Sequence, residues 1–202
     1  MVEETKFCSS IVNLTMPLAR WGHSSAFIES KLILCGGTVG NSTSAEASRT
    51  CDIYCMDTQR WLEGPVMEVE RHGAAGGAVL GKMYMVGGST GQGETASMEV
   101  YDPSKRQWSR GPDMPAAVTG ACAVVHRDAL IVSGGTNLTG ESLEVYMFNV
   151  TSNRWWQIKP MKQARANHGC SVNIRWDYLS QCQIHDLTIT FPKAYGAYGA
   201  RL

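Results

Sequence analysis

Apolar residues occur in short runs separated by polar turns, with four runs in each of three successive units. In the second unit the runs span residues 74–80, 82–86, 97–101 and 107–110. They are too short for helices, and no stretch shows a sustained helical stripe, so each run is predicted to form a strand. Tight-turn residues separate the first two runs of each unit: Glu29-Ser30, Leu80-Gly81 and Arg127-Asp128. The pattern therefore predicts four-stranded antiparallel units.

Four kinds of marker residue recur in register along the chain. Each unit has a Gly-Gly pair, then an aromatic residue, then a Trp seven positions later and a Met six positions after the Trp. Successive tryptophans are 47 residues apart. A period of this length with four strands per unit describes one blade of a β-propeller. The markers are Gly36-Gly37, Gly87-Gly88 and Gly134-Gly135; Tyr54, Tyr101 and Phe148; Trp61, Trp108 and Trp155; and Met67, Met114 and Met161, with Met16 opening the series.

These residues resemble the kelch repeat over about residues 16–174. The second unit matches best, with Arg71, Val86-Gly87-Gly88, Glu99-Val100-Tyr101-Asp102-Pro103, Trp108 and Asp113-Met114-Pro115. The third unit has Val118 in place of the Arg and Asn149 in place of the Asp, and the first has a loop four residues longer after Gly37. The resemblance implies an all-β, kelch-type β-propeller with about three complete four-stranded blades and partial blades at both termini.

The repeat phase sets the expected boundaries, and its loss at both ends leaves two interpretations open. Either the chain is a fragment or isoform of a longer propeller, which we favour, or residues 7–14 and 175–191 close a small four-bladed ring. The expected segments are a partial outer strand of a preceding blade (1–15), repeat 1 (16–65), repeat 2 (66–112), repeat 3 (113–160), the start of repeat 4 (161–174) and a divergent tail (175–202).

Charge balance excludes some partners. The chain has 18 basic and 18 acidic residues, so no overall field favours nucleic acid or an anionic membrane. No apolar run approaches the ~20 residues needed to cross a bilayer, and the first residues lack the apolar segment of a signal peptide. We therefore expect neither a nucleic-acid nor a membrane partner.

Cysteines and asparagines point to different compartments. The seven cysteines are odd in number and several lie in apolar strands, which favours free thiols, a reducing environment and a cytoplasmic location. Four Asn-X-Ser/Thr sequons favour the alternative of an extracellular glycosylated module. The sequons begin at Asn13, Asn41, Asn137 and Asn149.

No residue pattern indicates a cofactor, a metal or a catalytic group. Cys51 and Cys55 lie four positions apart on one predicted strand, hence ~13 Å apart, too far to share one zinc ion. His23 and His168 share one repeat phase but have no nucleophile or carboxylate near them in sequence, so both are interpreted as satisfied strand-end histidines. Propeller enzymes similar to galactose oxidase or sugar mutarotases remain an alternative, although their ligands and carboxylates cannot be matched here.

The candidate partner-binding residues lie in loops at one end of the predicted blades. In a four-stranded meander the second-to-third loop and the connection to the next blade emerge at the same end, and loops on a rigid scaffold favour recognition. Arginines at one repeat phase lie beside these loops and suit carboxylate or phosphopeptide groups; the alternative is arginines bonded to neighbouring backbone. The candidates are Arg20, Asn41, Ser44, Arg49, Arg71, Ser89, Gln92, Glu94, Asn137, Glu141 and Arg165.

The resemblance is strongest to the propellers of BTB-kelch proteins, which present substrates to a cullin-RING ubiquitin ligase. It implies a protein-interaction module that binds a partner peptide or protein through propeller-face loops. A ubiquitin-ligase substrate or a cytoskeletal protein is the expected partner, and substrate adaptor is the finer expected role. No BTB or BACK segment lies within the 202 residues.

Overall fold

The computed structural model describes residues 15–40, 46–172, 181–184 and 187–190. It contains three four-stranded antiparallel sheets, which we call blades 1, 2 and 3 in chain order. The described residues contain strands and turns and no helix, so the predicted all-β class is confirmed. Blade 1 is β2 (Ser24–Ile28), β3 (Lys31–Cys35), β5 (Cys51–Cys55) and β6 (Arg60–Glu63); blade 2 is β7 (Ala75–Val79), β8 (Lys82–Val86), β11 (Met98–Asp102) and β12 (Gln107–Arg110); blade 3 is β13 (Cys122–His126), β14 (Ala129–Ser133), β17 (Val145–Asn149) and β18 (Arg154–Ile158).

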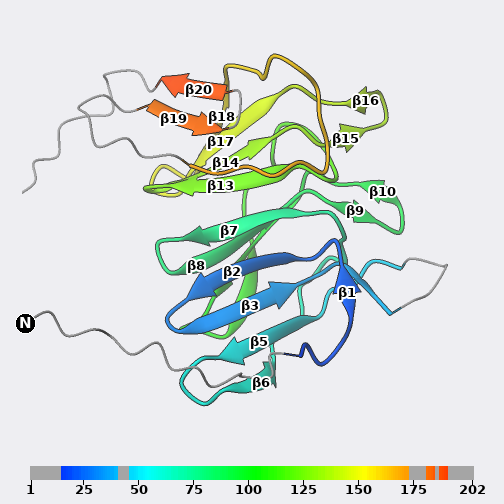
Figure 1. Cartoon of the computed structure of the whole chain (residues 1–202), viewed down its shortest axis with the longest axis vertical. Coiled ribbons are helices and arrows are strands. Elements are labelled where there is room, and N and C mark those ends of the chain that lie inside the picture. Colours follow the sequence, from blue (N-terminus) through cyan, green and yellow to red (C-terminus); the bar gives the residue numbers. More distant parts are fainter. Residues whose placement is uncertain (1–14, 41–45, 173–180, 185–186, 191–202) are drawn as a thin grey trace, which may run out of the picture.

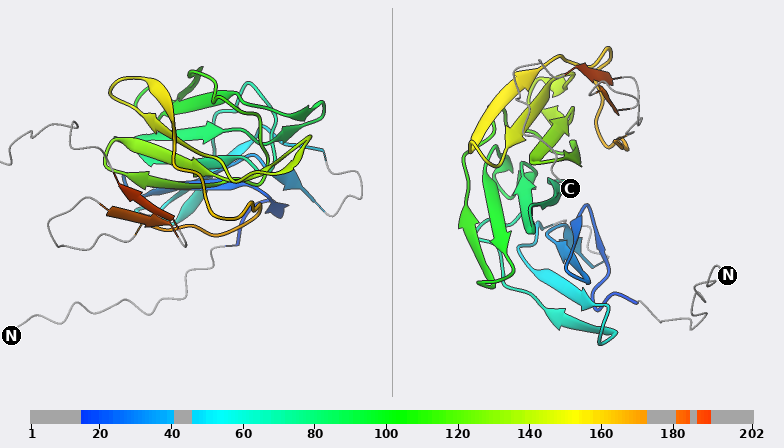
Figure 2. Two further views of the ribbon diagram at one scale, coloured as in Figure 1. Left: turned by 90° about the horizontal axis from the view of Figure 1, so that it is seen from above. Right: turned by 90° about the vertical axis from the view of Figure 1, so that its left-hand side faces the viewer.

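The three blades follow one another along an arc, as the right-hand view of Figure 2 shows. Their first strands β2, β7 and β13 lie on the inside of this arc, where β7 contacts both β2 and β13. Short strand pairs project from one end of the blades (Figure 1). These pairs are β1 (Arg20–Trp21) with β4 (Thr38–Val39), β9 (Ser89–Thr90) with β10 (Gly93–Glu94), and β15 (Thr136–Asn137) with β16 (Gly140–Glu141); a further hairpin joins β19 (Gln181–Ile184) and β20 (Leu187–Thr190).

The repeated aromatic residues join strands within a blade and join successive blades. Tyr101 and Trp108 are cross-strand partners with ring centroids 5.3 Å apart, and equivalent pairs occur in the other two blades. The indole Nε1 of Trp108 donates a hydrogen bond to the carbonyl of Pro65, at 2.9 Å, in the turn that precedes blade 2. Trp155 makes the same bond to Pro112. The indole nitrogen of Trp61 is buried without such a partner among the described residues.

Apolar side chains from facing sheets form the core. Ile33 and Ile53 of blade 1 pack against Met83 and Met85 of blade 2 in one cluster. A second cluster contains Tyr84 of blade 2 and Leu130, Val132 and Phe148 of blade 3. Each such side chain removed from water contributes about 1.5–3 kcal/mol. The blades are thus held mainly face to face by side chains whose spacing repeats with the sequence.

The Gly-Gly pairs form the joints between blades. Gly87 and Gly88 have φ angles of 67° and 95°, a region in which side chains other than glycine are strained. The amide of Gly88 donates a hydrogen bond to the carbonyl of Val118, at 2.8 Å, at the start of blade 3. A Cβ on Gly87 would lie 2.7 Å from that same carbonyl oxygen. Glycine is therefore required both by backbone conformation and by the close approach of the next blade.

A second backbone contact repeats along the inside of the arc. The amide of Gly73 donates to the carbonyl of Gly22 at 2.7 Å, and the amide of Gly120 donates to Gly73 at 2.8 Å. The amide of Asn167 continues the series by donating to Gly120 at 2.7 Å. One hydrogen bond per repeat thus links the segments that enter successive blades.

Four of the seven cysteines form two disulfides, which the cysteine pattern did not predict. Cys35 and Cys51 form a disulfide between paired positions on β3 and β5. Cys122 and Cys170 form a second disulfide, between β13 and the segment that follows blade 3. Among the described side chains that are not bridged, Cys55 is a buried free cysteine. Strand pairing brings together cysteines that lie far apart in sequence, which the odd total number of cysteines could not reveal.

Candidate functional site

Loops from neighbouring blades meet at the end of the molecule that carries the short strand pairs. The amide of His72 donates to the carbonyl of Ser89 at 3.0 Å, and Ser89 returns the bond at 2.8 Å. Thr119 and Thr136 make the same pair of bonds one blade later. Each connection between blades is therefore tied to a second-to-third loop, as the meander predicts. We call this end of the blades the rim.

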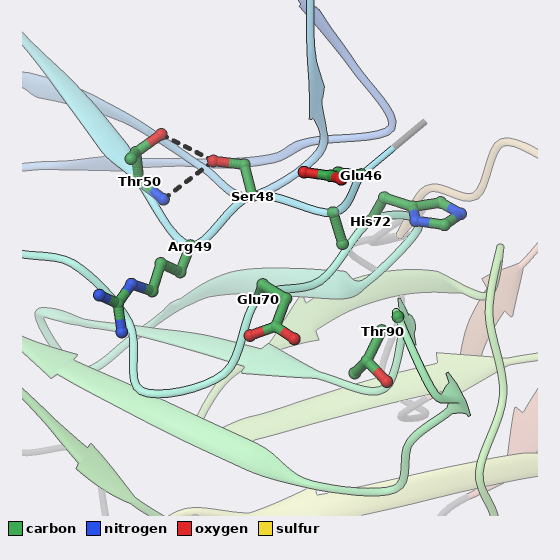
Figure 3. Close-up of a pocket in the computed structure, with 9 residues that line it drawn as sticks. Glu46, Ser48, Arg49, Thr50, Glu70, His72 and Thr90 are labelled. Carbon is green, nitrogen blue, oxygen red and sulfur yellow. Dashed lines mark hydrogen bonds between the residues drawn. The ribbon is translucent and has the colours of Figure 1, made fainter. Parts of the chain in front are cut away.

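A pocket of about 580 Å³ opens on the rim between blades 1 and 2 (Figure 3). One wall is the segment before β5, another is the connection from blade 1 to blade 2, and the third is the β9–β10 hairpin. The main-chain atoms of this region hold the walls in place, because Arg71 donates its amide to the carbonyl of Ser48 at 3.1 Å. The lining residues are Glu46, Ala47, Ser48, Arg49, Thr50, Glu70, His72, Thr90 and Gly91.

Three charged side chains border this pocket and are available to a ligand. Glu46, Arg49 and Glu70 are all exposed, and none of them forms an ion pair or side-chain hydrogen bond with another described residue. Glu46 and Arg49 lie on the segment before β5, and Glu70 lies on the connection from blade 1 to blade 2 (Figure 3). Ser48 and Thr50, in contrast, bond to each other through their hydroxyls at 2.8 Å and stiffen the wall that carries Arg49. The pocket thus presents two carboxylates and one guanidinium on loops whose backbone is held by hydrogen bonds.

Several predicted rim residues lie at or near this pocket. Arg49 lines it, and Ser89 anchors the hairpin that carries Thr90. Gln92 is exposed in the hairpin turn, and Glu94 pairs with Ser89 across β9 and β10. Asn137 and Glu141 belong to the corresponding hairpin of blade 3 and do not line the pocket. Asn41 and Ser44 lie outside the described residues.

The structure contradicts the prediction that Arg20 and Arg71 contact a partner. The Arg71 side chain is fully buried and donates to the carbonyl of Gly87 at 2.8 Å, to the carbonyl of Ser97 at 2.9 Å and to a carboxylate oxygen of Glu99 at 2.7 Å. Arg20 makes the equivalent contacts in blade 1, with Asp52 as its carboxylate partner at 2.5 Å. Each guanidinium thus links the Gly-Gly pair to the third strand of its own blade. The arginine recurs at one repeat position because it stabilises the fold.

Arg165 occupies the same phase, in the segment that follows blade 3. It is half-buried, and its backbone bonds to Ser142 and Gly135 at the end of blade 3. Among its described residues, blade 3 has no equivalent buried ion pair. One repeat length of 47 residues after Arg71 and Glu99, Val118 takes the place of the arginine and Tyr146 that of the acid. Val118 and Tyr146 both belong to the apolar cluster between blades 2 and 3. A contact of Arg165 with a partner stays a prediction.

Sequence reasoning missed most of the lining residues. Glu46, Glu70, His72 and Thr90 were not among the candidates, although Glu46, Glu70 and Thr90 lie in the loops predicted to emerge at this end of the blades. Their only sequence signal is position, since Glu70 directly precedes the repeated arginine and Thr90 follows a Gly-Gly pair by two residues. Which charged side chains meet in one pocket depends on how two blades sit side by side.

The two histidines at a shared phase are less well satisfied than expected. The Nδ1 atoms of His23 and His168 are buried without a hydrogen-bond partner among the described residues. His168 Nε2 lies 3.1 Å from the hydroxyl of Ser133. Burial lowers the pKa of His168, and the nearby charge of Arg165 lowers it further. Among the described residues, no three His, Cys, Asp or Glu side chains are grouped closely enough to hold a metal ion.

Comparison with known proteins identifies the family. The model of the KLHDC2/KLHL20/DRC7 kelch-repeats domain matches residues 2–178. The chain therefore belongs to this family of kelch-repeat domains, which are generally protein-interaction modules. In the part of the chain that the structure describes, no helix has the length and apolar character to span a membrane.

Solved structures share the fold. One of the 177 matching chains, titled "Structure of YjhT", has a TM-score of 0.64 and 19% sequence identity. The match covers 73% of this chain and 54% of that chain, so this chain spans about half the length of that structure. No curated protein matches the chain.

Proposed function

We propose that this chain is a protein-binding module whose contact surface is the rim pocket between blades 1 and 2. The observation that carries the proposal is the group of three exposed charged residues, Glu46, Arg49 and Glu70, around a pocket of about 580 Å³. None of these three side chains forms an ion pair or side-chain hydrogen bond with another described residue, so each can bind an opposite charge on a ligand without first breaking such a bond. Two carboxylates and one guanidinium favour a peptide segment that carries a basic residue near an acidic one.

The β9–β10 hairpin and the segment before β5 offer a ligand main-chain groups in addition to the charged side chains of the pocket. Loops held by a rigid scaffold can bind an extended peptide with little loss of conformational entropy. Thr90 uses its hydroxyl to accept a hydrogen bond from the Gln92 amide and to donate one to the Gly93 carbonyl, which fixes the hairpin turn beside the pocket. The pocket walls are therefore preorganised for binding.

A finer form of the proposal makes the partner a ubiquitin-ligase substrate, or a cytoskeletal protein, bound in the cytoplasm. Delivery to a ligase would require an adaptor domain besides the propeller. The disulfides Cys35–Cys51 and Cys122–Cys170 favour the extracellular alternative instead, because disulfides persist in oxidising compartments and are rare in the cytosol. The binding proposal itself holds in either compartment.

Charge reversal in the pocket tests the proposal. Peptides selected from a random library on the immobilised full chain should bind about tenfold more weakly to the Glu70→Lys variant, because a carboxylate that pairs with the peptide becomes a repelling charge; tenfold corresponds to about 1.4 kcal/mol. Arg49→Glu should weaken the same peptides. The measurement is the dissociation constant by calorimetry or fluorescence anisotropy.

Glu141→Lys is the matched control, since Glu141 is an exposed hairpin glutamate outside the pocket. It makes the same change in net charge and should leave binding within about twofold. If Glu141→Lys and Glu70→Lys weaken binding equally, the peptides respond to overall charge and the pocket is not their site.

A further inference from the structure

A second pocket lies between blades 1 and 2, at the end of the blades opposite the rim. Its volume is about 120 Å³. Lys31 follows the turn between β2 and β3, and Arg106 belongs to the turn between β11 and β12. The two pockets share no lining residue. The second pocket is lined by Ile28, Lys31, Ile33, Ile53, Leu62, Tyr101, Pro103 and Arg106.

Comparison of the blades shows why this pocket is open. Ile33 is the third residue of β3, and Tyr84 is the third residue of β8, the equivalent strand of blade 2. The ring of Tyr84 packs against Phe148 of blade 3, with ring centroids 5.9 Å apart. Between blades 1 and 2, Tyr101 takes the place of Phe148, but Ile33 has no ring to set against it. The pocket therefore lies where the ring of Tyr84 lies one blade later.

The pocket has the size and the lining that an aromatic ring requires. Ile28, Ile33 and Ile53 are buried apolar side chains, and Leu62 is 48% exposed beside them. An apolar cavity of about 150 Å³ is large enough to bind benzene. Aromatic rings pack favourably at centroid distances of about 4.5–7 Å, so a ring in this pocket would pack on Tyr101 as Tyr84 packs on Phe148.

The same comparison explains a lysine without a partner. Lys82, at the start of β8, forms an ion pair with Asp102, at the end of β11, with 2.9 Å between Nζ and Oδ2. Lys31 starts β3 in the same way, but its cross-strand partner at the end of β5 is Cys55. With no acid at that position, Lys31 forms no ion pair or side-chain hydrogen bond with another described residue.

Arg106 brings a second positive charge to the pocket, from blade 2. Its side chain is exposed and forms no ion pair with another described residue. Burial raises the pKa of the Tyr101 phenol, and the positive charge of Arg106 opposes this rise, as a guanidinium near the ring should. The described residues that line the pocket include no carboxylate. Two cations beside an apolar space favour a ligand that carries negative charge next to an apolar group.

We propose that this pocket binds a segment of a partner protein in which an aromatic residue stands next to a glutamate or an aspartate. The ring fills the space that Tyr84 fills between blades 2 and 3, and it packs on Tyr101. The carboxylate pairs with Lys31 and Arg106. The partner thus supplies the ring and the acid that blade 2 has in its own chain. Because this pocket and the rim pocket share no residue, the inference is independent of the proposed function.

NMR titration of the ¹⁵N-labelled full chain with capped peptides tests the proposal. The probes are acetyl-Gly-Phe-Glu-Gly-amide and the same peptide with Phe and Glu exchanged. At least one probe should shift the amide signals of residues 28–33 and 101–106 to saturation and leave those of residues 46–50 and 70–72 unchanged. Control peptides with Ala for Phe, or Gln for Glu, should bind at least about tenfold more weakly, because each lacks the ring or the charge.

Three outcomes of this titration would overturn the proposal. The first is that neither probe binds, and the second is that a control peptide binds as tightly as the better probe. The third is that the shifted signals belong to the rim pocket, which would assign the peptides to the proposed contact surface.

Two variants assign the binding to this pocket. Lys31→Glu should weaken the better probe at least about tenfold. Lys105→Glu is the matched control and should change binding by less than about twofold, because Lys105 is an exposed neighbour of Arg106 that does not line the pocket. Ile33→Tyr copies blade 2 and fills the pocket with the chain's own ring, so the folded variant should not bind the probe. Equal binding by the two lysine variants, or full binding by folded Ile33→Tyr, would contradict the assignment.

Discussion

Replacing Arg71 with alanine should lower the free energy of unfolding by about 3–5 kcal/mol, the usual cost of breaking a buried ion pair from one side. Both side chains are almost fully removed from water, at 0% and 3% exposure for Arg71 and Glu99. The substitution leaves the Glu99 carboxylate and the carbonyls of Gly87 and Ser97 without their guanidinium donor. Urea unfolding followed by tryptophan fluorescence measures the change.

Two comparisons make this prediction specific. Arg110 and Asp113 form an exposed ion pair, so Arg110→Ala should cost less than about 1 kcal/mol. The double variant Arg71→Val with Glu99→Tyr copies the residues of blade 3 and leaves no buried charge, so it should be more stable than Arg71→Ala alone. A loss for Arg71→Ala as small as that for Arg110→Ala would contradict the structural role of the buried arginine.

Gly87→Ala should destabilise the protein by about 3 kcal/mol or more, because backbone strain and a steric clash act together. The added Cβ would lie 2.7 Å from the carbonyl oxygen of Val118, the same oxygen that accepts the hydrogen bond of Gly88. Relieving the clash would move blade 3 away from blade 2. Chemical denaturation again gives the free energy.

Gly81 provides the matched control for the cost of backbone strain without a steric clash. Its φ of 74° is close to the 67° of Gly87, but a Cβ there would meet no atom within 4 Å. Gly81→Ala should therefore cost only the conformational strain, about 1–2 kcal/mol. Equal losses for the two variants would show that the Gly-Gly pair is not a tight joint between blades.

Most of the fold could be predicted because most markers do the same physical task in successive blades. Trp108 and Trp155 each bond to a proline carbonyl of the preceding turn, and this needs one fixed spacing. Burial alternates along β2 and β7, whereas β5 and β14 are short, mainly apolar runs buried at every position. Those features are local or periodic, and a single sequence displays them directly.

The roles of individual polar residues were harder to predict. The sequence favours Arg71 as a binding residue, but in the structure it pairs with Glu99, 28 residues later. Arg20 pairs with Asp52, which is the equivalent acidic residue of repeat 1 once its four-residue longer loop is taken into account. In blade 3 the arginine and the acid are both absent. The joint presence of an arginine and an acid in blades 1 and 2, and their joint absence in blade 3, are the sequence signal for a buried ion pair.

The pocket and the disulfides depend on distances between segments far apart in the chain. Glu46 and Glu70 lie 24 residues apart and meet only because the connection to blade 2 folds back beside the segment before β5. Cysteine pairing cannot be deduced from counts and spacings alone. Such features need the register of strands and the contact of blades, which no short motif encodes.

Hydrogen–deuterium exchange with a bound peptide tests the central claim, that the rim pocket is the binding surface. With a library-selected peptide present, residues 46–50, 70–72 and 90–91 should exchange more slowly than in the free chain. The turns at 80–81 and 127–128, at the opposite end of the blades, should exchange at an unchanged rate. Protection of those turns with an unprotected pocket would contradict the account.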